Sequence, residues 1–398
     1  MLLSVGGVIH CIFSLTNRAS ACYYNGTSKP FSQRLGIYRW GEERMSDNMK
    51  AVVVKPGNRL GLEDVPKPRL VKNDDAIVKV TTAAICGSDL HVKNARVPGI
   101  QPGDVVGHEF VGIVTEVGPH VTRFKPGDRV TAPPAFWCGG CPACRRGDIS
   151  YCHNGGIYGS GEILGRGYRG GAQASFMRIV YADNCLVSVP DSIPDEQAVL
   201  VPDVFQTSYH AESDGHIGVE DTVVIFGCGP IGLGALISAQ LFGPKQVLSV
   251  DMRDKRLAVA RQFGAVAIDA RKENVAERIK EMTQGEGADV AIEAVGVPEA
   301  FSQALRSVRR FGSVSAVGVF SQPAEFPLQD YCAKGNGVRL SIGLGYIGRT
   351  STLLGVVESG RVDLRHLITH TFSLDDAPEA YELFENHQDE CIKVILKP

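Results

Sequence analysis

The sequence predicts an α/β protein with two domains, one a mostly antiparallel β-rich domain and the other a doubly wound parallel sheet. Its 398 residues suggest two to three domains, because one domain takes about 150 residues. From Lys50 onward, short β-rich runs alternate with Gly, Pro and Asp clusters, a pattern typical of antiparallel sheets. Beyond Pro202, strand-like and helix-like segments alternate instead, which indicates a parallel sheet covered by helices.

The β-rich domain is expected to hold short strands at residues 51–54, 76–80, 110–117 and 129–132. The parallel-sheet domain is expected to hold helices that start at Ile231 and Lys255 and strands at residues 222–226, 246–250, 288–293 and 313–317. The last part of the chain reverts to short strands that end with residues 392–396, so the C-terminus should complete the β-rich domain. The expected domain limits are residues 49–203 with 344–398, and residues 204–343.

The composition excludes several classes of protein. The formal net charge is −3, 44% of the residues are hydrophobic and 21% are charged, which argues against a disordered chain and against a nucleic-acid binder driven by basic charge. No run of 18 or more apolar residues occurs, so we expect no transmembrane helix. The 11 cysteines are odd in number and four of them are clustered, which suits metal ligation in a reducing compartment better than disulfides.

Residues 1–48 are expected to form an extension outside both domains. Residues 1–15 are apolar but lack a preceding basic residue, and Ala19-Ser20-Ala21 resembles a signal-peptidase site. The segment is also basic and free of acids before Glu42, which is typical of a transit peptide. We favour a third interpretation, in which translation begins at Met45 or Met49. We therefore expect a cytoplasmic protein, or a mitochondrial one if the transit peptide is real.

The first chemical motif is Gly227-Cys228-Gly229-Pro230-Ile231-Gly232, directly after an expected strand. Its glycines allow a tight turn and let the backbone approach a pyrophosphate at the N-terminus of the next helix. Asp251, 19 residues after Gly232, ends the next expected strand. A carboxylate there accepts hydrogen bonds from the adenosine ribose and repels a 2′-phosphate, which favours NAD over NADP. Arg253 and Lys255 leave NADP open, and a glycine-rich turn that serves packing alone is the structural alternative.

The second motif is a lobe at residues 138–152 that carries Cys138, Cys141, Cys144 and Cys152 on Gly- and Pro-rich turns. Four thiolates can enclose one tetrahedral Zn²⁺ and leave no position for a substrate, so such a site is structural. An iron–sulfur cluster is the alternative at this point, because four thiolates also hold one.

The third constellation is dispersed along the chain. Cys86 opens the segment Cys86-Gly87-Ser88-Asp89-Leu90-His91, His108 lies in Gly107-His108-Glu109, and Asp203 precedes an expected helix. A catalytic zinc site has three protein ligands and an open position, and these side chains are suitable donors. Each also has a structural alternative: a small buried hydrophobe for Cys86, a core histidine for His108 and a helix N-cap for Asp203.

From about Met49 to Pro398, these motifs together resemble zinc-containing medium-chain alcohol dehydrogenases. The resemblance implies a GroES-like catalytic domain, a Rossmann cofactor domain, NAD as cofactor and two Zn²⁺ per chain. It implies that Cys86 and His108 bind the catalytic zinc and that the four clustered cysteines bind the structural one. Asp203 stands where many members have a second cysteine, as in the branch that includes glutathione-independent formaldehyde dehydrogenases and some bacterial secondary-alcohol dehydrogenases.

An aspartate in place of a cysteine leaves the charge of the ligand set unchanged. One thiolate, one neutral imidazole and one carboxylate sum to −2, as two thiolates and an imidazole would. Because oxygen is the harder donor, we expect a stronger Lewis acid and an altered substrate preference. Glu109 is assigned a resting or exchange role, because its permanent ligation would leave the site with a charge of −1.

The resemblance also implies a proton path and a set of cofactor contacts. Ser88 resembles the family's relay hydroxyl, and His91 resembles the terminal base reached through the cofactor ribose. The structural alternatives are a turn-capping hydroxyl and a surface histidine. Asp89 is expected to hydrogen-bond the free nitrogen of His108. The residues expected to contact the cofactor are Thr207, Gly227, Gly229, Pro230, Ile231, Gly232, Asp251, Arg256, Val295 and Val317.

The sequence therefore predicts a zinc-dependent oxidoreductase that transfers hydride between a primary or secondary alcohol and NAD. Polyols and threonine are the rival substrates within the family. A non-catalytic NAD-binding protein is the rival class; its mark would be loss of the metal ligands, which this sequence keeps. The expected partners are a small alcohol or aldehyde and further copies of the chain, in a dimer or tetramer, with no nucleic acid and no membrane.

Overall fold

The computed structural model describes residues 47–57, 59–333, 335–343, 345–386 and 390–398, together with His10–Cys11 and Cys22–Tyr23. The chain divides into two compact units, Met1–Asp47 and Asn48–Pro398. In the first unit, β1 (His10–Cys11) pairs antiparallel with β2 (Cys22–Tyr23). The signal-like site, the transit-like character and the start at Met45 concern residues that lie outside the described ones.

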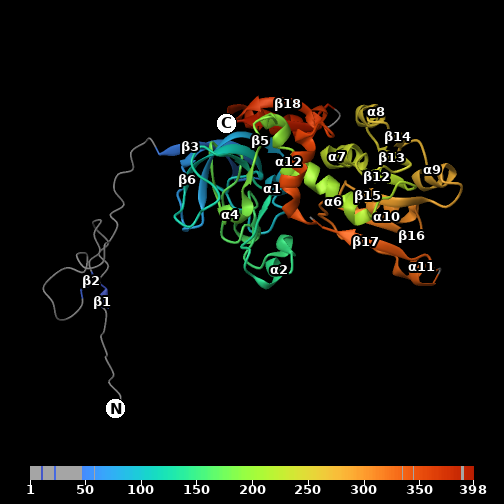
Figure 1. Ribbon diagram of the computed structural model, residues 1–398, viewed down its shortest axis with the longest axis horizontal. Coiled ribbons are helices and arrows are strands. Elements are labelled where there is room, and N and C mark those ends of the chain that lie inside the picture. Colours follow the sequence, from blue (N-terminus) through green and yellow to red (C-terminus); the bar gives the residue numbers. More distant parts are fainter. Residues whose placement is uncertain are drawn as a thin grey trace, which may run out of the picture. The chain divides into compact units, whose positions relative to one another are not determined.

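The β-rich domain is built on a seven-stranded sheet whose strands pair antiparallel, except that β18 and β19 are parallel (Figure 1). The strand order is β11-β7-β6-β5-β19-β18, and β10 also pairs with β5. The strands are β5 (Ala76–Ile85), β6 (Glu109–Val117), β7 (Arg129–Thr131), β10 (Phe176–Ile179), β11 (Val187–Ser188), β18 (Ile368–Ser373) and β19 (Lys393–Lys397). Since β19 pairs with β5, the end of the chain lies in the same sheet as its early strands.

Smaller strand pairs and short helices surround this sheet. The pairs are β3 (Asn48–Lys55) with β4 (Arg59–Pro66) and β8 (Ala135–Phe136) with β9 (Gly156–Ile157). The α-helices are α1 (Gly87–Lys93), α2 (Pro142–Arg145), α3 (Gly161–Leu164), α4 (Ala182–Cys185) and α5 (Asp195–Ala198). Short 3₁₀ helices lie at Ile149–Tyr151, Ile347–Arg349, Arg365–Leu367 and Leu374–Asp376.

Strand β5 is five residues longer than the sequence predicted. Its end at residue 80 was expected, yet the strand continues through two threonines to Ile85. Register shifts between β5 and β6 at Ile77/Val78 and Val80/Thr82 accommodate the extra length. β-branched residues favour an extended backbone, so the extension brings the strand directly up to Cys86.

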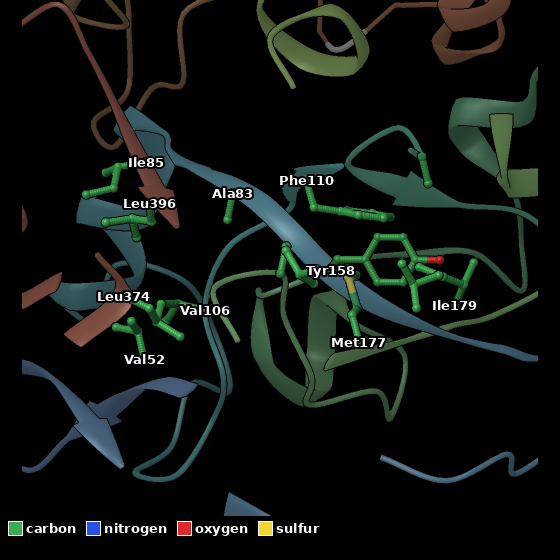
Figure 2. Close-up of a cluster of buried hydrophobic side chains, with 14 of the residues drawn as sticks. Val52, Ala83, Ile85, Val106, Phe110, Tyr158, Met177, Ile179, Leu374 and Leu396 are labelled. Atoms are coloured by element: carbon green, nitrogen blue, oxygen red, sulfur yellow. The ribbon is translucent and has the colours of Figure 1, made fainter. Parts of the chain in front are cut away.

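The core of the β-rich domain joins distant parts of the chain. Val52 from β3 and Leu396 from β19 belong to one cluster of buried side chains, and Figure 2 shows it around Phe110, Tyr158 and Met177. Tyr158 is fully buried there, and its ring lies 5.1 Å from that of Phe136. Burial of this large apolar surface fixes the sheet that carries the functional side chains.

The parallel-sheet domain has six strands in the order β14-β13-β12-β15-β16-β17, and every neighbouring pair is parallel. The strands are β12 (Thr222–Phe226), β13 (Gln246–Asp251), β14 (Val266–Asp269), β15 (Ala288–Glu293), β16 (Val308–Ala316) and β17 (Val338–Ile342). The connecting helices are α7 (Pro230–Ala239), α8 (Asp254–Gln262), α9 (Val275–Met282), α10 (Pro298–Ser307) and α11 (Leu328–Ala333). This order reverses beside β12, which creates the crevice where doubly wound sheets bind dinucleotides.

Helices cover both faces of this sheet. Along β12, Val223 and Ile225 pack into one buried cluster, whereas Val224 and Phe226 pack into another. Because successive side chains of a strand point to opposite faces, both faces of β12 are buried. This explains why β12 is a continuous apolar run in the sequence, without alternation of apolar and polar residues.

Helix α6 (Gln206–Gly215) leads into the parallel-sheet domain. Helices α12 (Thr350–Glu358) and α13 (Ala377–Asn386) come after the last strand of that domain. The short strands expected at the end of the chain are present as β18 and β19, but α12 precedes them and α13 lies between them, and neither helix was predicted from the sequence. In α13 the buried residues are Ala377, Ala380, Tyr381 and Phe384, which is the spacing of one helix face. Among the described residues, every helix is too short or too polar to span a bilayer.

Candidate active site

Four cysteines of the β-rich domain come together in the lobe that follows β8. The Sγ atoms of Cys141 and Cys144 are 3.5 Å apart, those of Cys141 and Cys152 are 3.8 Å apart, and those of Cys152 and Cys138 are 3.5 Å apart. A tetrahedral zinc with Zn–S bonds of about 2.3 Å requires sulfur atoms about 3.8 Å apart. The cluster therefore fits one closed metal site.

The backbone of this lobe is arranged around the sulfur atoms. The N–H of Cys138 donates to Sγ of Cys152 at 3.3 Å, and the N–H of His153 donates to Sγ of Cys141 at 3.4 Å. Such donors, that of Cys144 above all, lower the pKa of the Cys141 thiol to about 6. Burial raises the pKa of Cys144 to about 12 and also raises that of Cys152. Since the thiolate is the form that binds a metal, Cys141 is the member of the cluster that its surroundings prepare most for ligation.

A second cluster brings together side chains from three separate segments of the chain. Candidate ligand atoms of Cys86, His108, Glu109 and Asp203 all lie within 4.8 Å of one another. Asp203 Oδ2 is 3.5 Å from Cys86 Sγ and 3.4 Å from His108 Nε2. Ligands bound at about 2.0–2.3 Å in a tetrahedron are about 3.3–3.6 Å apart, so these three side chains fit one zinc ion without rearrangement.

Asp203 reaches this cluster from a π-helical turn, Val201–Phe205, in which the Phe205 N–H donates to the carbonyl of Leu200 at 2.9 Å. Since α6 begins only at Gln206, Asp203 is not the N-cap of that helix, and the capping alternative is wrong. Burial alone would raise the pKa of Asp203, but the hydrogen bond and charge of His108 hold it well below its usual range. The wide turn thus presents a charged carboxylate to the cluster.

Glu109 is paired with a residue that sequence reasoning missed. Nζ of Lys393 donates to Glu109 Oε1 at 2.6 Å, and the two side chains are 1% and 0% exposed. Oε2 of Glu109 is buried without a hydrogen-bond partner among the described residues. The buried ammonium offsets the third negative charge of the cluster, that of Glu109. The one sign of this buried pair in the sequence was a lysine inside the otherwise apolar run at residues 391–396.

Helix α1 carries the other three residues predicted beside the metal. Asp89 is 1% exposed, and its Oδ2 accepts the N–H of Cys86 at 2.9 Å, so Asp89 rather than Ser88 caps the first turn. Asp89 Oδ1 faces Nδ1 of His108 at 3.9 Å, which is longer than the predicted hydrogen bond. Ser88 and His91 are half-buried and three residues apart, so they share a helix face. Partial burial and the charge of Arg96 lower the pKa of His91.

The glycine motif forms the turn between β12 and α7. Gly227 has a φ of +94°, and a Cβ on Gly232 would lie 1.8 Å from the Gly227 carbonyl oxygen, so both positions need glycine for the fold. A Cβ on Gly229 would instead face open space beside the Arg256 guanidinium, 3.8 Å away. Packing therefore explains two of the glycines but not Gly229, which leaves room for a phosphate at the helix start defined by Pro230.

Asp251 ends β13 beside this turn and holds three backbone groups. Its Oδ2 accepts the N–H of Cys228 at 2.7 Å, and its Oδ1 accepts those of Met252 at 2.7 Å and Arg253 at 2.9 Å. A cavity of about 480 Å³ opens directly after Asp251, lined by Met252, Arg253, Asp254, Lys255, Arg271 and Glu390. The Arg271 guanidinium lies 2.6 Å from both Asp254 and Asp269, and Lys255 is 2.8 Å from Glu390.

The remaining residues predicted to contact the cofactor lie in the parallel-sheet domain, except Thr207, which lies on α6. Nε of Arg256 is buried without a partner among the described residues, and its Nη2 donates to the carbonyl of Cys391 at 3.5 Å. Val295 is 48% exposed after β15, and Val317 and Ile231 are half-buried. Thr207 lies elsewhere, on α6, where its hydroxyl donates to Asp203 Oδ1 at 3.4 Å. Thr207 therefore contacts a candidate metal ligand.

Comparison with known proteins identifies the family. Residues 72–191 match the model of the alcohol dehydrogenase GroES-like domain, and residues 230–359 match that of the zinc-binding dehydrogenase. An alcohol dehydrogenase of Cupriavidus necator is 36% identical over 378 residues, which cover 89% of this chain and 100% of that protein. A sorbitol dehydrogenase of Bacillus subtilis is 33% identical over 355 residues, which cover 88% of this chain and 98% of that protein.

A solved structure of an alcohol dehydrogenase from Thermus sp. ATN1 superimposes with a TM-score of 0.82 at 37% identity, covering 88% of this chain and 99% of that one. The chain belongs to the zinc-containing medium-chain alcohol dehydrogenase family. It is an oxidoreductase of that family, with a GroES-like domain and a Rossmann domain. The predicted family, fold class and enzyme class are confirmed.

Proposed function

We propose that this enzyme oxidises primary or secondary alcohols, including polyols, with NAD at a zinc ion held by Cys86, His108 and Asp203. The observation that carries the proposal is the pair of separations at Asp203 Oδ2, 3.5 Å to Cys86 Sγ and 3.4 Å to His108 Nε2. A second, structural zinc belongs to Cys138, Cys141, Cys144 and Cys152. This assigns the chain to the branch of the family with an aspartate as third ligand.

When bound, the zinc supplies a Lewis acid that lowers the pKa of a substrate hydroxyl, and NAD supplies the hydride acceptor. The chain's own residues then move the proton. Ser88 accepts it from the substrate as it gives up its own hydroxyl proton by way of the cofactor ribose, and His91, on the same face of α1, receives that proton and passes a proton to solvent. Burial keeps His91 in its neutral, accepting form at neutral pH, because its pKa is lowered.

The charges around the metal support this assignment. The Cys86 thiolate, the neutral His108 and the Asp203 carboxylate sum to −2, which a divalent zinc neutralises. Glu109 adds one negative charge, but the buried ammonium of Lys393 offsets it. Glu109 thus has a charge partner of its own and acts as a resting or exchange group rather than as a permanent ligand.

NAD is proposed over NADP because two of the cations at the adenosine end, Arg271 and Lys255, already have carboxylate partners. Asp251 stands where the adenosine ribose binds in a doubly wound sheet. Beyond it, Arg271 is held by Asp254 and Asp269, and Lys255 by Glu390. Gly227, Gly229, Pro230, Ile231 and Gly232 are proposed to receive the pyrophosphate together with Arg256, and Val295 and Val317 to contact the nicotinamide.

We also propose that the chain works as a homo-oligomer in the cytoplasm, with its domains at residues 49–203 with 344–398 and at residues 204–343. Strand β17 is an edge of the parallel sheet, and Leu340 and Ile342 on it are 39% and 63% exposed. An exposed apolar edge strand favours pairing with another chain. No disulfide joins the described cysteines of the unit Asn48–Pro398, which supports a reducing compartment.

The proposal is tested by following NADH and NADPH formation with a panel of alcohols, polyols and threonine. We expect NADH formation with alcohols or polyols, and its loss in Cys86→Ala. Oxidation of threonine alone would transfer the proposal to that substrate. Turnover that survives in Cys86→Ala would contradict the assigned zinc site.

A further inference from the structure

Gln173 occupies the space directly behind the proposed catalytic zinc ligands. It precedes β10 and is fully buried. Its Nε2 donates to Asp89 Oδ2 at 2.9 Å and to the carbonyl of Ala84 at 3.3 Å, and its Oε1 accepts the hydroxyl of Tyr381 at 2.8 Å. Every hydrogen-bonding group of this amide except one lone pair is thus used within the protein.

The backbone of Gln173 is tied to the segment that carries His108. The N–H of Gln173 donates to the carbonyl of Val106 at 3.0 Å, and the N–H of Ala172 donates to that of Gly107 at 2.8 Å. Gly107 has a φ of +92°, and a Cβ there would lie 2.5 Å from Cγ of Gln173. One residue therefore contacts the segments before Cys86 and before His108, as well as Asp89 itself.

The direction of these hydrogen bonds is fixed by chemistry. Oδ2 of Asp89 accepts the Cys86 N–H, so the NH₂ group of Gln173 faces Asp89 as a second donor and its carbonyl oxygen faces Tyr381. The Tyr381 hydroxyl must then donate. Burial and the nearby Asp89 charge raise the pKa of Tyr381 well above its usual value, which keeps the hydroxyl protonated. The chain from Tyr381 to Asp89 has one orientation.

The two oxygens of Asp89 have different neighbours as a result. Its Oδ2 accepts both the Cys86 N–H and the Gln173 amide at 2.9 Å. Its Oδ1 is the atom that faces Nδ1 of His108, at 3.9 Å. A zinc on Nε2 of an imidazole requires the proton on Nδ1, and an anion facing Nδ1 favours that tautomer.

We propose that Gln173 and Tyr381 are positioning residues for the catalytic zinc, which fix Asp89 so that its Oδ1 faces the Nδ1 proton of His108. This inference rests on the zinc site of the proposed function. Gln173 and Tyr381 are 84 and 292 residues from Asp89 in the chain, and no motif of the sequence pointed to either. The C-terminal helix α13 thereby acts on a metal site built from other elements.

The alternative is that Gln173 and Tyr381 only cross-link the core. Two variants separate these roles: Tyr381→Phe, which removes one oxygen atom, and Gln173→Met, which removes the amide. Tyr168→Phe is the matched control, because Tyr168 is also buried in this domain and its hydroxyl donates to the Arg178 carbonyl at 2.9 Å. Tyr381→Phe keeps the buried ring, so it carries the test whether or not Gln173→Met folds.

The experiment measures zinc dissociation constants of the full chain by competition with a chromogenic chelator, together with the absorption bands of the cobalt-substituted protein. We expect Tyr381→Phe and Gln173→Met to weaken one of two sites about 10-fold, as loss of a group that orients a ligand does, and to shift its cobalt bands. The double variant should weaken it by less than the product of the two effects.

Wild-type zinc affinity at both sites in Tyr381→Phe would overturn the inference. Equal weakening of both sites, or the same effect in Tyr168→Phe, would also overturn it, because a general loss of stability acts on both sites. If the wild-type chain binds zinc only at the four cysteines, the proposed function itself fails. That outcome differs from two intact sites that the variants leave unchanged.

Discussion

The ammonium of Lys393 donates a hydrogen bond to Glu109 Oε1 over 2.6 Å, and neither side chain is more than 1% exposed. Strand β19 thus delivers a positive charge to the acidic cluster from the far end of the chain. A buried ion pair adds little net stability compared with an apolar pair, but removal of one partner leaves an uncompensated buried charge. Replacement of Lys393 alone should therefore destabilise the protein more than replacement of both Lys393 and Glu109.

We predict that Lys393→Met lowers the free energy of unfolding by about 3–5 kcal/mol. Lys393→Met/Glu109→Gln should recover a large part of this loss, because the second change removes the stranded carboxylate. The exposed pair Lys255–Glu390 provides the control, and Lys255→Met should have a much smaller effect. Urea denaturation of the zinc-loaded protein measures all three, and a double variant no more stable than Lys393→Met would refute the pairing.

Glu212 predicts a pH dependence of stability. It is fully buried between α6 and α7, where the Ser238 hydroxyl donates to its Oε2 at 2.8 Å, and burial raises its pKa well above the usual value. The folded protein keeps a proton that the unfolded chain releases above about pH 4.3, so stability falls as the pH rises from there towards the folded pKa. The loss is at most about 1.4 kcal/mol per pH unit.

Glu212→Gln removes this proton and should flatten the pH dependence of the free energy of unfolding, with the largest gain over wild type at alkaline pH. Urea denaturation at a series of pH values measures it. The exposed Glu277 is the control, since Glu277→Gln should leave the wild-type pH profile in place. A Glu212→Gln profile that still falls with pH as steeply as wild type would show that another group is responsible.

His91 is predicted to be the last acceptor of the proton. His91→Gln should lower kcat at neutral pH by about 100-fold, the usual contribution of a general base, and leave zinc content unchanged. Because burial and Arg96 lower the pKa of His91, the acid limb of the wild-type kcat profile should lie below the ordinary histidine value of about 6.5. The exposed His120 serves as control. Equal losses in His91→Gln and His120→Gln would exclude a proton path through His91.

Asp251 is predicted to set the preference for NAD. Asp251→Asn removes the charge that would repel a 2′-phosphate but keeps one oxygen for the Cys228 N–H. The ratio of kcat/KM for NADP to that for NAD should rise about 10-fold, which corresponds to about 1.4 kcal/mol of differential binding. Initial rates with both cofactors measure it. An unchanged ratio would mean that the paired cations around Arg271, rather than Asp251, control the preference.

The site features that the sequence predicted depend on residues close together in the chain, whereas the ones it missed depend on contacts between distant residues. The glycine turn, the four cysteines and the segment from Cys86 to His91 each lie within a few residues, so their spacing carries their chemistry. Asp203 was harder, because only the π-helical turn distinguishes a ligand from an N-cap. The partners of the site came from remote segments. Lys393 reaches it through the pairing of β19 with β5, Tyr381 through the packing of α13, and Gln173 through its hydrogen bonds to Asp89 and Ala84.

The ends of the strands also could not be predicted from the sequence. The extension of β5 depends on bulges against β6, and bulges depend on the partner strand rather than on local preference. The apolar spacing of α13 was present in the sequence, with Ala377, Ala380, Tyr381 and Phe384 on one face. Tyr381 would have been placed in a helix core by that period, but its hydroxyl's partner depends on tertiary contacts.

The central claim is that Asp203 completes a catalytic zinc site with Cys86 and His108. The most direct measurement is zinc per chain, by elemental analysis, in the wild type and in Asp203→Ala, with NADH formation followed on the same samples. We expect two zinc ions in the wild type, one in Asp203→Ala and loss of alcohol oxidation with the missing ion. Two zinc ions and intact oxidation in Asp203→Ala would contradict the account.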